Sequence, residues 1–163
     1  MRKRIIIMTT VIIVFVVGAC NWFMSDRLPG IGIPLEEMNN VLQLSAPPEI
    51  NTFKIGDNLR LVLVNSSDTP VILPQDYGVY IFQNVEGKWD PIENRIDYPP
   101  GEKNIYPRED QPFREVILFV HPYIISDQPV TVRIVVVGNR NNELSGAKEE
   151  QVGAFTDVTL QPK

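Results

Sequence analysis

From residue 50 onward the sequence is a succession of short apolar runs, rich in β-branched residues, which proline, glycine and small polar residues separate. Such runs are typical of strands joined by tight turns. The expected strands are 58–65, 71–73, 79–84, 88–92, 103–106, 115–120, 130–137 and 153–160. No helix-length pattern alternates with them. The sequence therefore predicts an all-β fold, an antiparallel β-sandwich over residues 50–163.

Two of these runs carry predictions about burial. Residues 130–137 read VTVRIVVV, and because only Thr131 and Arg133 interrupt the apolar residues, the second half is expected to be buried on both faces. Tyr80 and Phe82 lie two residues apart on the strand 79–84 and so point to the same side. Both are expected to face the core.

The N-terminus has the pattern of a secretory signal. Three cationic residues at 2–4 precede an almost uninterrupted apolar run at 5–17, which Gly18, Ala19 and the single cysteine, Cys20, follow. A helix over 5–19 would be about 22 Å long, shorter than the roughly 30 Å hydrocarbon core of a bilayer. Residues 22–24 extend the apolar run, however, and a helix over 5–24 would span. A cleaved signal peptide at 1–19 and an uncleaved signal-anchor helix both stay open.

Val17-Gly18-Ala19-Cys20 resembles the lipobox of bacterial lipoproteins, an aliphatic residue and two small residues before a cysteine. The resemblance implies lipidation of Cys20, so a covalent lipid is expected there. With either kind of anchor, residues 25–163 would lie outside the cytoplasm, held at the cell membrane or the outer membrane. Residues 20–49 are expected to be the lipidation site and a tether, with a possible short helix at 34–44, because proline and glycine interrupt the segment at both ends.

Three further segments resemble the immunoglobulin-like domains found in bacterial lipoproteins. They are Phe53–Asn65, which contains Gly56-Asp57, then Pro70–Leu73, then Gly87-Lys88-Trp89. The resemblance implies an immunoglobulin-like β-sandwich with Trp89 packed in or against the core, and it implies no reaction. The same strand order is similar, more distantly, to a family of bacterial proteinase inhibitors with a sandwich fold.

Charge narrows the range of partners. Of the 15 basic and 20 acidic residues, three basic ones precede Cys20, which leaves 12 basic and 20 acidic residues and a net charge of −8 after it. An acidic domain repels nucleic acid, so no nucleic-acid partner is expected. It also repels anionic lipid, so the anchor must supply the affinity for membrane lipid. With no cysteine beyond Cys20, the domain depends on its apolar core rather than on disulfides.

No pattern of catalytic or metal-ligating residues stands out. His121 is the only histidine, so it is the only candidate general base for a nucleophilic serine. No serine lies in the sharp strand-to-helix turn where such a nucleophile is found. A blue-copper site needs two histidines and a cysteine, and the acidic residues do not have EF-hand spacing. Asn65-Ser66-Ser67 matches a glycosylation sequon but is better interpreted as a turn. The protein is predicted to be no enzyme and to hold no cofactor or metal beyond the lipid.

The expected function is a non-enzymatic, membrane-anchored module that binds another envelope protein or is an accessory subunit of a membrane complex. The proline-rich loop 93–114 is the candidate surface, with Tyr98, Tyr106 and Arg108 as partner-binding residues. A stiff aromatic loop loses little entropy on binding. Packing of this loop onto its own domain is the alternative. A second possible function is a surface proteinase inhibitor or ligand-binding sandwich that uses the same loop.

Overall fold

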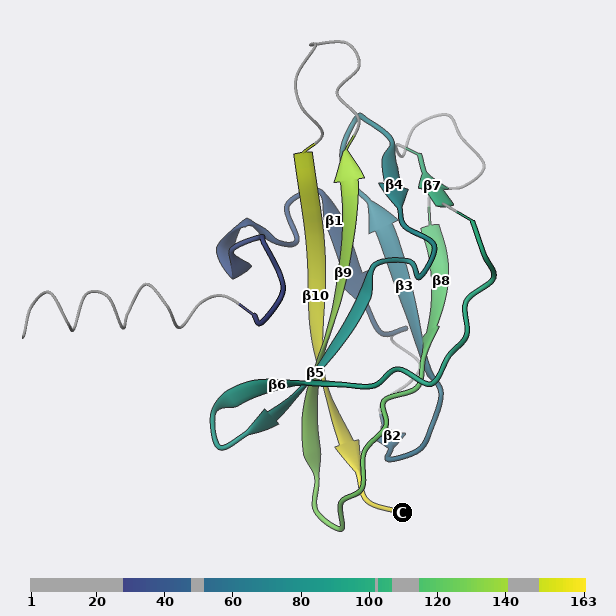
Figure 1. The fold of residues 1–163 in the computed structure, drawn as a ribbon. Coiled ribbons are helices and arrows are strands. Elements are labelled where there is room, and N and C mark those ends of the chain that lie inside the picture. Colours follow the sequence, from purple (N-terminus) through teal and green to yellow (C-terminus); the bar gives the residue numbers. More distant parts are fainter. Residues whose placement is uncertain (1–27, 48–51, 102, 107–114, 141–149) are drawn as a thin grey trace, which may run out of the picture.

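The computed structural model describes residues 28–47, 52–101, 103–106, 115–140 and 150–163, and these ranges form an all-β domain (Figure 1). One turn of 3-10 helix, η1 (Leu35–Glu37), precedes the strands. The strands are β1 (Leu42–Ser45), β2 (Phe53–Lys54), β3 (Leu59–Asn65), β4 (Val71–Leu73), β5 (Val79–Val85), β6 (Lys88–Ile92), β7 (Lys103–Ile105), β8 (Glu115–Val120), β9 (Val130–Arg140) and β10 (Glu150–Gln161). The strand positions predicted from the sequence are confirmed.

The strands form two sheets. The small sheet has the order β1-β3-β8, and the large sheet has the order β2-β10-β9-β4-β7, with β5 and β6 attached to it through β9. All pairs are antiparallel except β2 with β10, which is parallel. One long side of β9 pairs with β10, and the other pairs first with β5 and then, at Asn139 and Arg140, with β4.

Gly78 lies where β9 passes from one of these partners to the other. Val137 donates a backbone hydrogen bond to the Gly78 carbonyl at 2.9 Å. A Cβ atom on Gly78 would lie 1.9 Å from the Val137 carbonyl oxygen, and the residue has φ +60°. Only glycine fits so close an approach at a positive φ. The glycine therefore allows β4 and β5 to share one side of β9.

The main core lies between the two sheets. Along β3 the side chains alternate between fully buried and half-buried positions, which is the pattern of a strand with one face toward a core. Leu61 and Leu118 from the small sheet pack in the same buried cluster as Ile81, Ile134 and Val136 from the large sheet. The predicted antiparallel β-sandwich is confirmed.

A second apolar cluster lies on the outer face of the large sheet. Residues 28–38 cross this face beside β10 (Figure 1), and Ile33 and Met38 bury Phe82, Val135 and Val137. Val135 and Val137 thus face this cover, while Ile134 and Val136 face the main core. The prediction that the second half of 130–137 is buried on both faces is confirmed.

Asn39 fastens the covering segment to β10. Its backbone N–H donates to the Gly153 carbonyl and its side-chain Oδ1 accepts from the Phe155 N–H, both at 2.9 Å. Asn39 has φ +64°, in the left-handed region that asparagine tolerates better than most residues. Asn39 therefore bonds to β10 with both its backbone and its side chain in this conformation.

The predicted helix at 34–44 is wrong. Only Leu35–Glu37 form a helical turn, and Leu42–Ser45 form β1, which pairs with β3. Leu42 and Leu44 are buried while Gln43 and Ser45 are exposed, so the period is two rather than 3.6. The predicted tether is likewise wrong for residues 28–47, which belong to the sandwich, so the domain does not begin at residue 50. Residues 20–27 lie outside the described ranges.

Tyr80 and Phe82 point to the same side, as predicted, but only Phe82 is buried in a core cluster, so the prediction that both face the core is wrong for Tyr80. Phe82 is buried in the second cluster, whereas Tyr80 is 42% exposed. Both face the outer side of the large sheet, and residues 28–38 cover only Phe82. Trp89 packs, partly buried, against the same cluster.

Within the described ranges no helix is long and apolar enough to span a bilayer, and the predicted signal peptide or anchor at 1–24 lies outside those ranges.

Candidate functional site

The most distinctive surface of the domain is a row of exposed apolar side chains along β8. Burial alternates strictly from Glu115 to Ile125, so that one side of the chain faces the core and the other faces outward. The outward positions are Ile117 (44% exposed), Phe119 (49%), His121 (half-buried), Tyr123 (40%) and Ile125 (84%). We call these five residues the β8 stripe. Eight residue steps of extended chain correspond to a stripe of about 26 Å.

The sheet topology explains why the stripe is exposed. β8 is the last strand of the small sheet, and its inner side supplies Leu118 and Val120 to the main core. The opposite side of the same strand must then point away from the core. Ile117 lies opposite Val62 on β3, which is half-buried. The stripe therefore meets Val62 on β3, and Arg60 of β3 lies opposite Phe119.

Residues 93–95 run alongside the chain that follows β8 and hold it in place. The Arg95 N–H donates to the His121 carbonyl and the Tyr123 N–H donates to the Glu93 carbonyl, both at 3.0 Å. Asn94 Oδ1 accepts from the His121 N–H at 3.0 Å. These bonds keep residues 121–123 extended, so the alternation of β8 continues past the end of the strand.

Tyr98 secures the neighbouring part of β8. Its hydroxyl donates to the Phe119 carbonyl at 2.8 Å and accepts from Asn94 Nδ2 at 3.1 Å. Its ring lies against Tyr77, with the ring centroids 4.9 Å apart. Burial raises the pKa of Tyr98, the hydrogen bond from Asn94 lowers it, and the charge of Asp76 raises it further. The hydroxyl is thus bonded within the domain as a neutral group.

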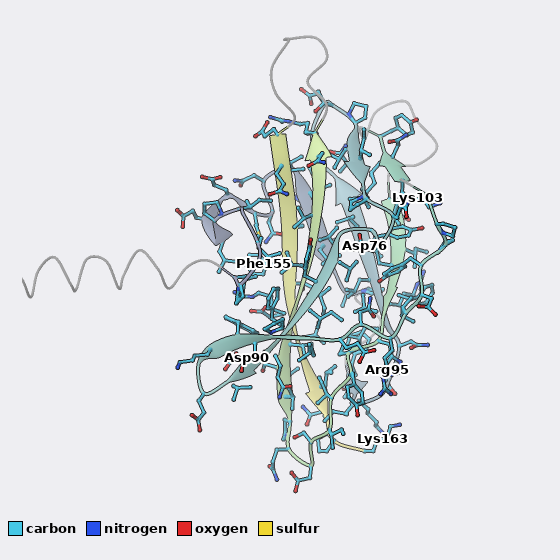
Figure 2. All side chains as sticks on the ribbon, viewed as in Figure 1. Asp76, Asp90, Arg95, Lys103, Phe155 and Lys163 are labelled. Carbon is cyan, nitrogen blue, oxygen red and sulfur yellow. The ribbon has the colours of Figure 1, made fainter. Side chains whose placement is uncertain are left out.

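Arg95 adds a positive charge to the stripe. Its guanidinium carbon lies 3.6 Å above the centroid of the Tyr123 ring, in the geometry of a cation–π contact. Figure 2 shows Arg95 beside the end of β8. Arginine and tyrosine are both enriched among residues that dominate binding energy at protein interfaces. The stripe therefore offers apolar area beside two cations, Arg95 and, opposite Phe119 in the register, the half-buried Arg60 of β3.

The residues that the sequence singled out lie in different places. Tyr98 packs onto its own domain next to the stripe, as the alternative interpretation expects, and Tyr106 is half-buried just after β7. Arg108 and Cys20 lie outside the described residues. His121 Nδ1 lies 2.7 Å from Asn58 Oδ1. In the part of the chain that the structure describes, no three metal-ligating side chains come together.

Sequence reasoning missed the stripe, although a signal for it exists. Residues 115–120 read EVILFV, with Ile117 and Phe119 at positions that a half-buried strand normally fills with polar residues. Because both faces of this strand are apolar, either face could pack against the core. The sequence alone therefore does not reveal which apolar side chains face outward. The register against β3 supplies that information.

Comparison with known proteins yields no relative. The chain matches no protein-family model, no curated protein and no solved structure. The resemblances to the lipobox and to immunoglobulin-like lipoprotein domains stay predictions, and a functional argument for this chain rests on its own residues.

Proposed function

We propose that this protein is a membrane-anchored, extracytoplasmic lipoprotein that acts as a non-enzymatic protein-binding module, with the β8 stripe as the surface that receives its partner. The observation that carries the proposal is the row of exposed side chains Ile117, Phe119, Tyr123 and Ile125. A contiguous exposed apolar surface on a small domain marks an interaction site.

The scaffold behind the stripe favours tight recognition. β8 is hydrogen-bonded to β3 over six residue pairs, and Asn94 and Tyr98 hold its far end. A surface that is already fixed in its bound shape loses little conformational entropy when a partner docks. We infer that the partner presents an apolar surface of its own, with an acceptor group positioned for Arg95.

The position of residues 28–38 supports a module held close to its membrane. If Cys20 carries the lipid, only seven residues separate it from Leu28, which is buried against the large sheet. The eight residue steps from Cys20 to Leu28 span at most about 28 Å. The stripe belongs to the outer face of the small sheet, whereas residues 28–38 lie on the outer face of the large sheet. The stripe therefore faces away from the segment that leads to the anchor.

The stripe is tested by charge substitution. Phe119→Lys places a cation at the middle of the stripe and should abolish co-purification of the partner after mild detergent extraction of native membranes. Tyr80→Lys is the matched control, because Tyr80 is exposed to a similar degree on the large sheet. Tyr80→Lys should retain the partner. Equal recovery of the same partner with both variants would rule out the stripe.

The anchor is tested by the intact mass of the membrane form. A lipoprotein begins at Cys20 and carries acyl chains on that residue, and Cys20→Ser should abolish the mass increase and release the domain from the membrane. If the mature protein instead begins at Met1 and carries no lipid, the lipoprotein assignment is wrong and the N-terminal segment is a signal-anchor helix.

A further inference from the structure

A polar pocket lies on the large sheet where the β5–β6 hairpin separates from β9. β5 pairs with β9 only as far as Gln83 opposite Val132, whereas β5 and β6 stay paired to Val85 and Lys88. Figure 1 shows the hairpin leaving the body of the sheet at this point. The pocket between the hairpin and the start of β9 has a volume of about 610 Å³. Small-molecule sites commonly have volumes of about 300–1,000 Å³. We call this pocket the fork.

The fork offers several kinds of hydrogen-bonding group beside one aromatic ring. The residues that line it include five with polar side chains, Gln83, Asn84, Glu86, Thr131 and Asp157, and one aromatic residue, Trp89. The Thr131 hydroxyl lies 3.4 Å from that of Thr159, a weak contact. Residues with hydrogen-bonding side chains therefore line an open pocket that the indole ring of Trp89 borders.

Arg133 fixes Trp89 and Asp157 from within the sheet. Its guanidinium carbon lies 4.2 Å from the Trp89 ring centroid and 4.5 Å from that of Phe155. Two of its nitrogens donate to the two Asp157 carboxylate oxygens, each at 2.7 Å. The Arg133 side chain is only 12% exposed, so it holds Trp89 and Asp157 from the sheet side and leaves little of its own surface to a ligand. Trp89 and Asp157 are thus pre-positioned, and the charge of Asp157 is balanced.

These charges select the ligand class. No lysine or arginine is among the described residues that line the fork, so an anionic ligand would meet only the carboxylates. A cation stacked on Trp89 would be repelled by Arg133, which already occupies one side of that ring at 4.2 Å. An apolar ligand would bury amides and carboxylates without hydrogen bonds. A neutral ligand that carries many hydroxyl groups and one apolar face could hydrogen-bond to the polar residues of the fork without burying an unpaired charge.

We propose that the fork binds a saccharide. Sugar hydroxyls donate to Glu86 and Asp157 and exchange hydrogen bonds with Gln83 and Thr131, while the C–H face of the sugar ring lies against Trp89. The fork belongs to the large sheet, away from the β8 stripe, so this inference does not depend on a protein partner at the stripe.

Trp89 is the reporter for the test. The chain has two tryptophans, Trp22 and Trp89, so Trp22→Phe leaves the fork residue as the only one. This full-length protein in detergent is titrated with chitotriose, cellotriose and maltotriose while the emission of Trp89 is followed, and binding is confirmed by calorimetry. We expect at least one trisaccharide to give a saturable change that differs less than about twofold between low and high salt, because a neutral ligand is not screened.

Paired variants locate the binding. Gln83→Ala with Thr131→Val removes two hydrogen-bonding groups and should weaken binding by about tenfold or more. The matched control is Gln43→Ala with Thr156→Val, the same changes outside the fork, which should leave the affinity unchanged. The absence of saturable binding for all three trisaccharides would overturn the proposal, and so would equal weakening by the control pair. Saturable, salt-sensitive binding of a lysine peptide in place of the sugars would also overturn it.

Discussion

Asn65 shows what one buried polar side chain does in this sandwich. It is fully buried at the end of β3, and its Nδ2 donates to the carbonyls of Thr69 at 2.8 Å and Ile105 at 3.0 Å. Its Oδ1 accepts from the backbone N–H and the hydroxyl of Ser67. Both Nδ2 hydrogens are therefore used inside the domain. The interpretation of Asn65-Ser66-Ser67 as a turn is confirmed, and the amide joins β3 to β7 across the core.

Asn65→Asp is predicted to lower the free energy of unfolding by about 3 kcal/mol or more. The change replaces two donors by acceptors next to two buried carbonyls and introduces a buried charge. Urea denaturation of the full-length protein in detergent measures the effect. Asn40→Asp is the control, since its side chain is exposed and should change stability by only about 0.5 kcal/mol or less. Similar losses for the two variants would contradict this role of Asn65.

Tyr98 gives a prediction about alkaline pH. Because burial raises the pKa of its hydroxyl in the folded protein, folding favours the neutral form. This contribution to stability is complete below the unfolded-state pKa of about 10 and is lost as the pH rises through the folded-state pKa. Between about pH 8 and about pH 11, the unfolding free energy of Tyr98→Phe should therefore fall less steeply than that of the wild type. Parallel slopes would show that Tyr98 ionises equally easily in both states.

Among the elements, residues 28–38 account for the burial of the large sheet on both sides. Leu28, Ile31, Ile33 and Met38 all pack into the cluster above β9. A Cβ atom on Gly153 would lie 3.1 Å from Ile33 Cδ1, so the segment approaches β10 closely at that glycine. The segment acts as a third layer over part of the sandwich.

Ile33→Ala is predicted to lower the free energy of unfolding by about 2–4 kcal/mol, because it opens a cavity above β9 and β10. The same change at the exposed residue Ile125 should alter stability by about 0.5 kcal/mol or less. Thermal or urea unfolding compares the two variants. If Ile33→Ala were as mild as Ile125→Ala, residues 28–38 would not be part of the cooperative fold.

The same elements show how far the sequence alone could lead. Local pattern located eight of the ten described strands, all but β1 and β2, because alternation in β3 and the long apolar run in β9 follow directly from which faces are buried. The cover over β9 depends on contacts between Ile33 or Met38 and residues about a hundred positions away, which no local period encodes. Leu35, Met38, Val41 and Leu42 fit a helical spacing by coincidence, and pairing of Leu42 with Asn65 decides for a strand. The β8 stripe was not predicted for the same reason. The pairing of β8 with β3, rather than the local sequence, determines which side of β8 faces outward.

The whole molecule has two different outer faces. The face of the large sheet carries residues 28–38, where the chain enters the sandwich, and the fork beside Trp89. The face of the small sheet carries the β8 stripe with Arg95 over Tyr123. This division predicts a molecule that faces its anchor with one sheet and a protein partner with the other.

Site-specific photocrosslinking in native membranes tests this account most directly. A photoreactive residue replaces Phe119 in the stripe or, as the control, Tyr80 on the large sheet, two positions of similar exposure. The account predicts a discrete adduct of one partner protein from position 119 and none from position 80. Adducts of equal yield from both positions, or none from position 119, would contradict it.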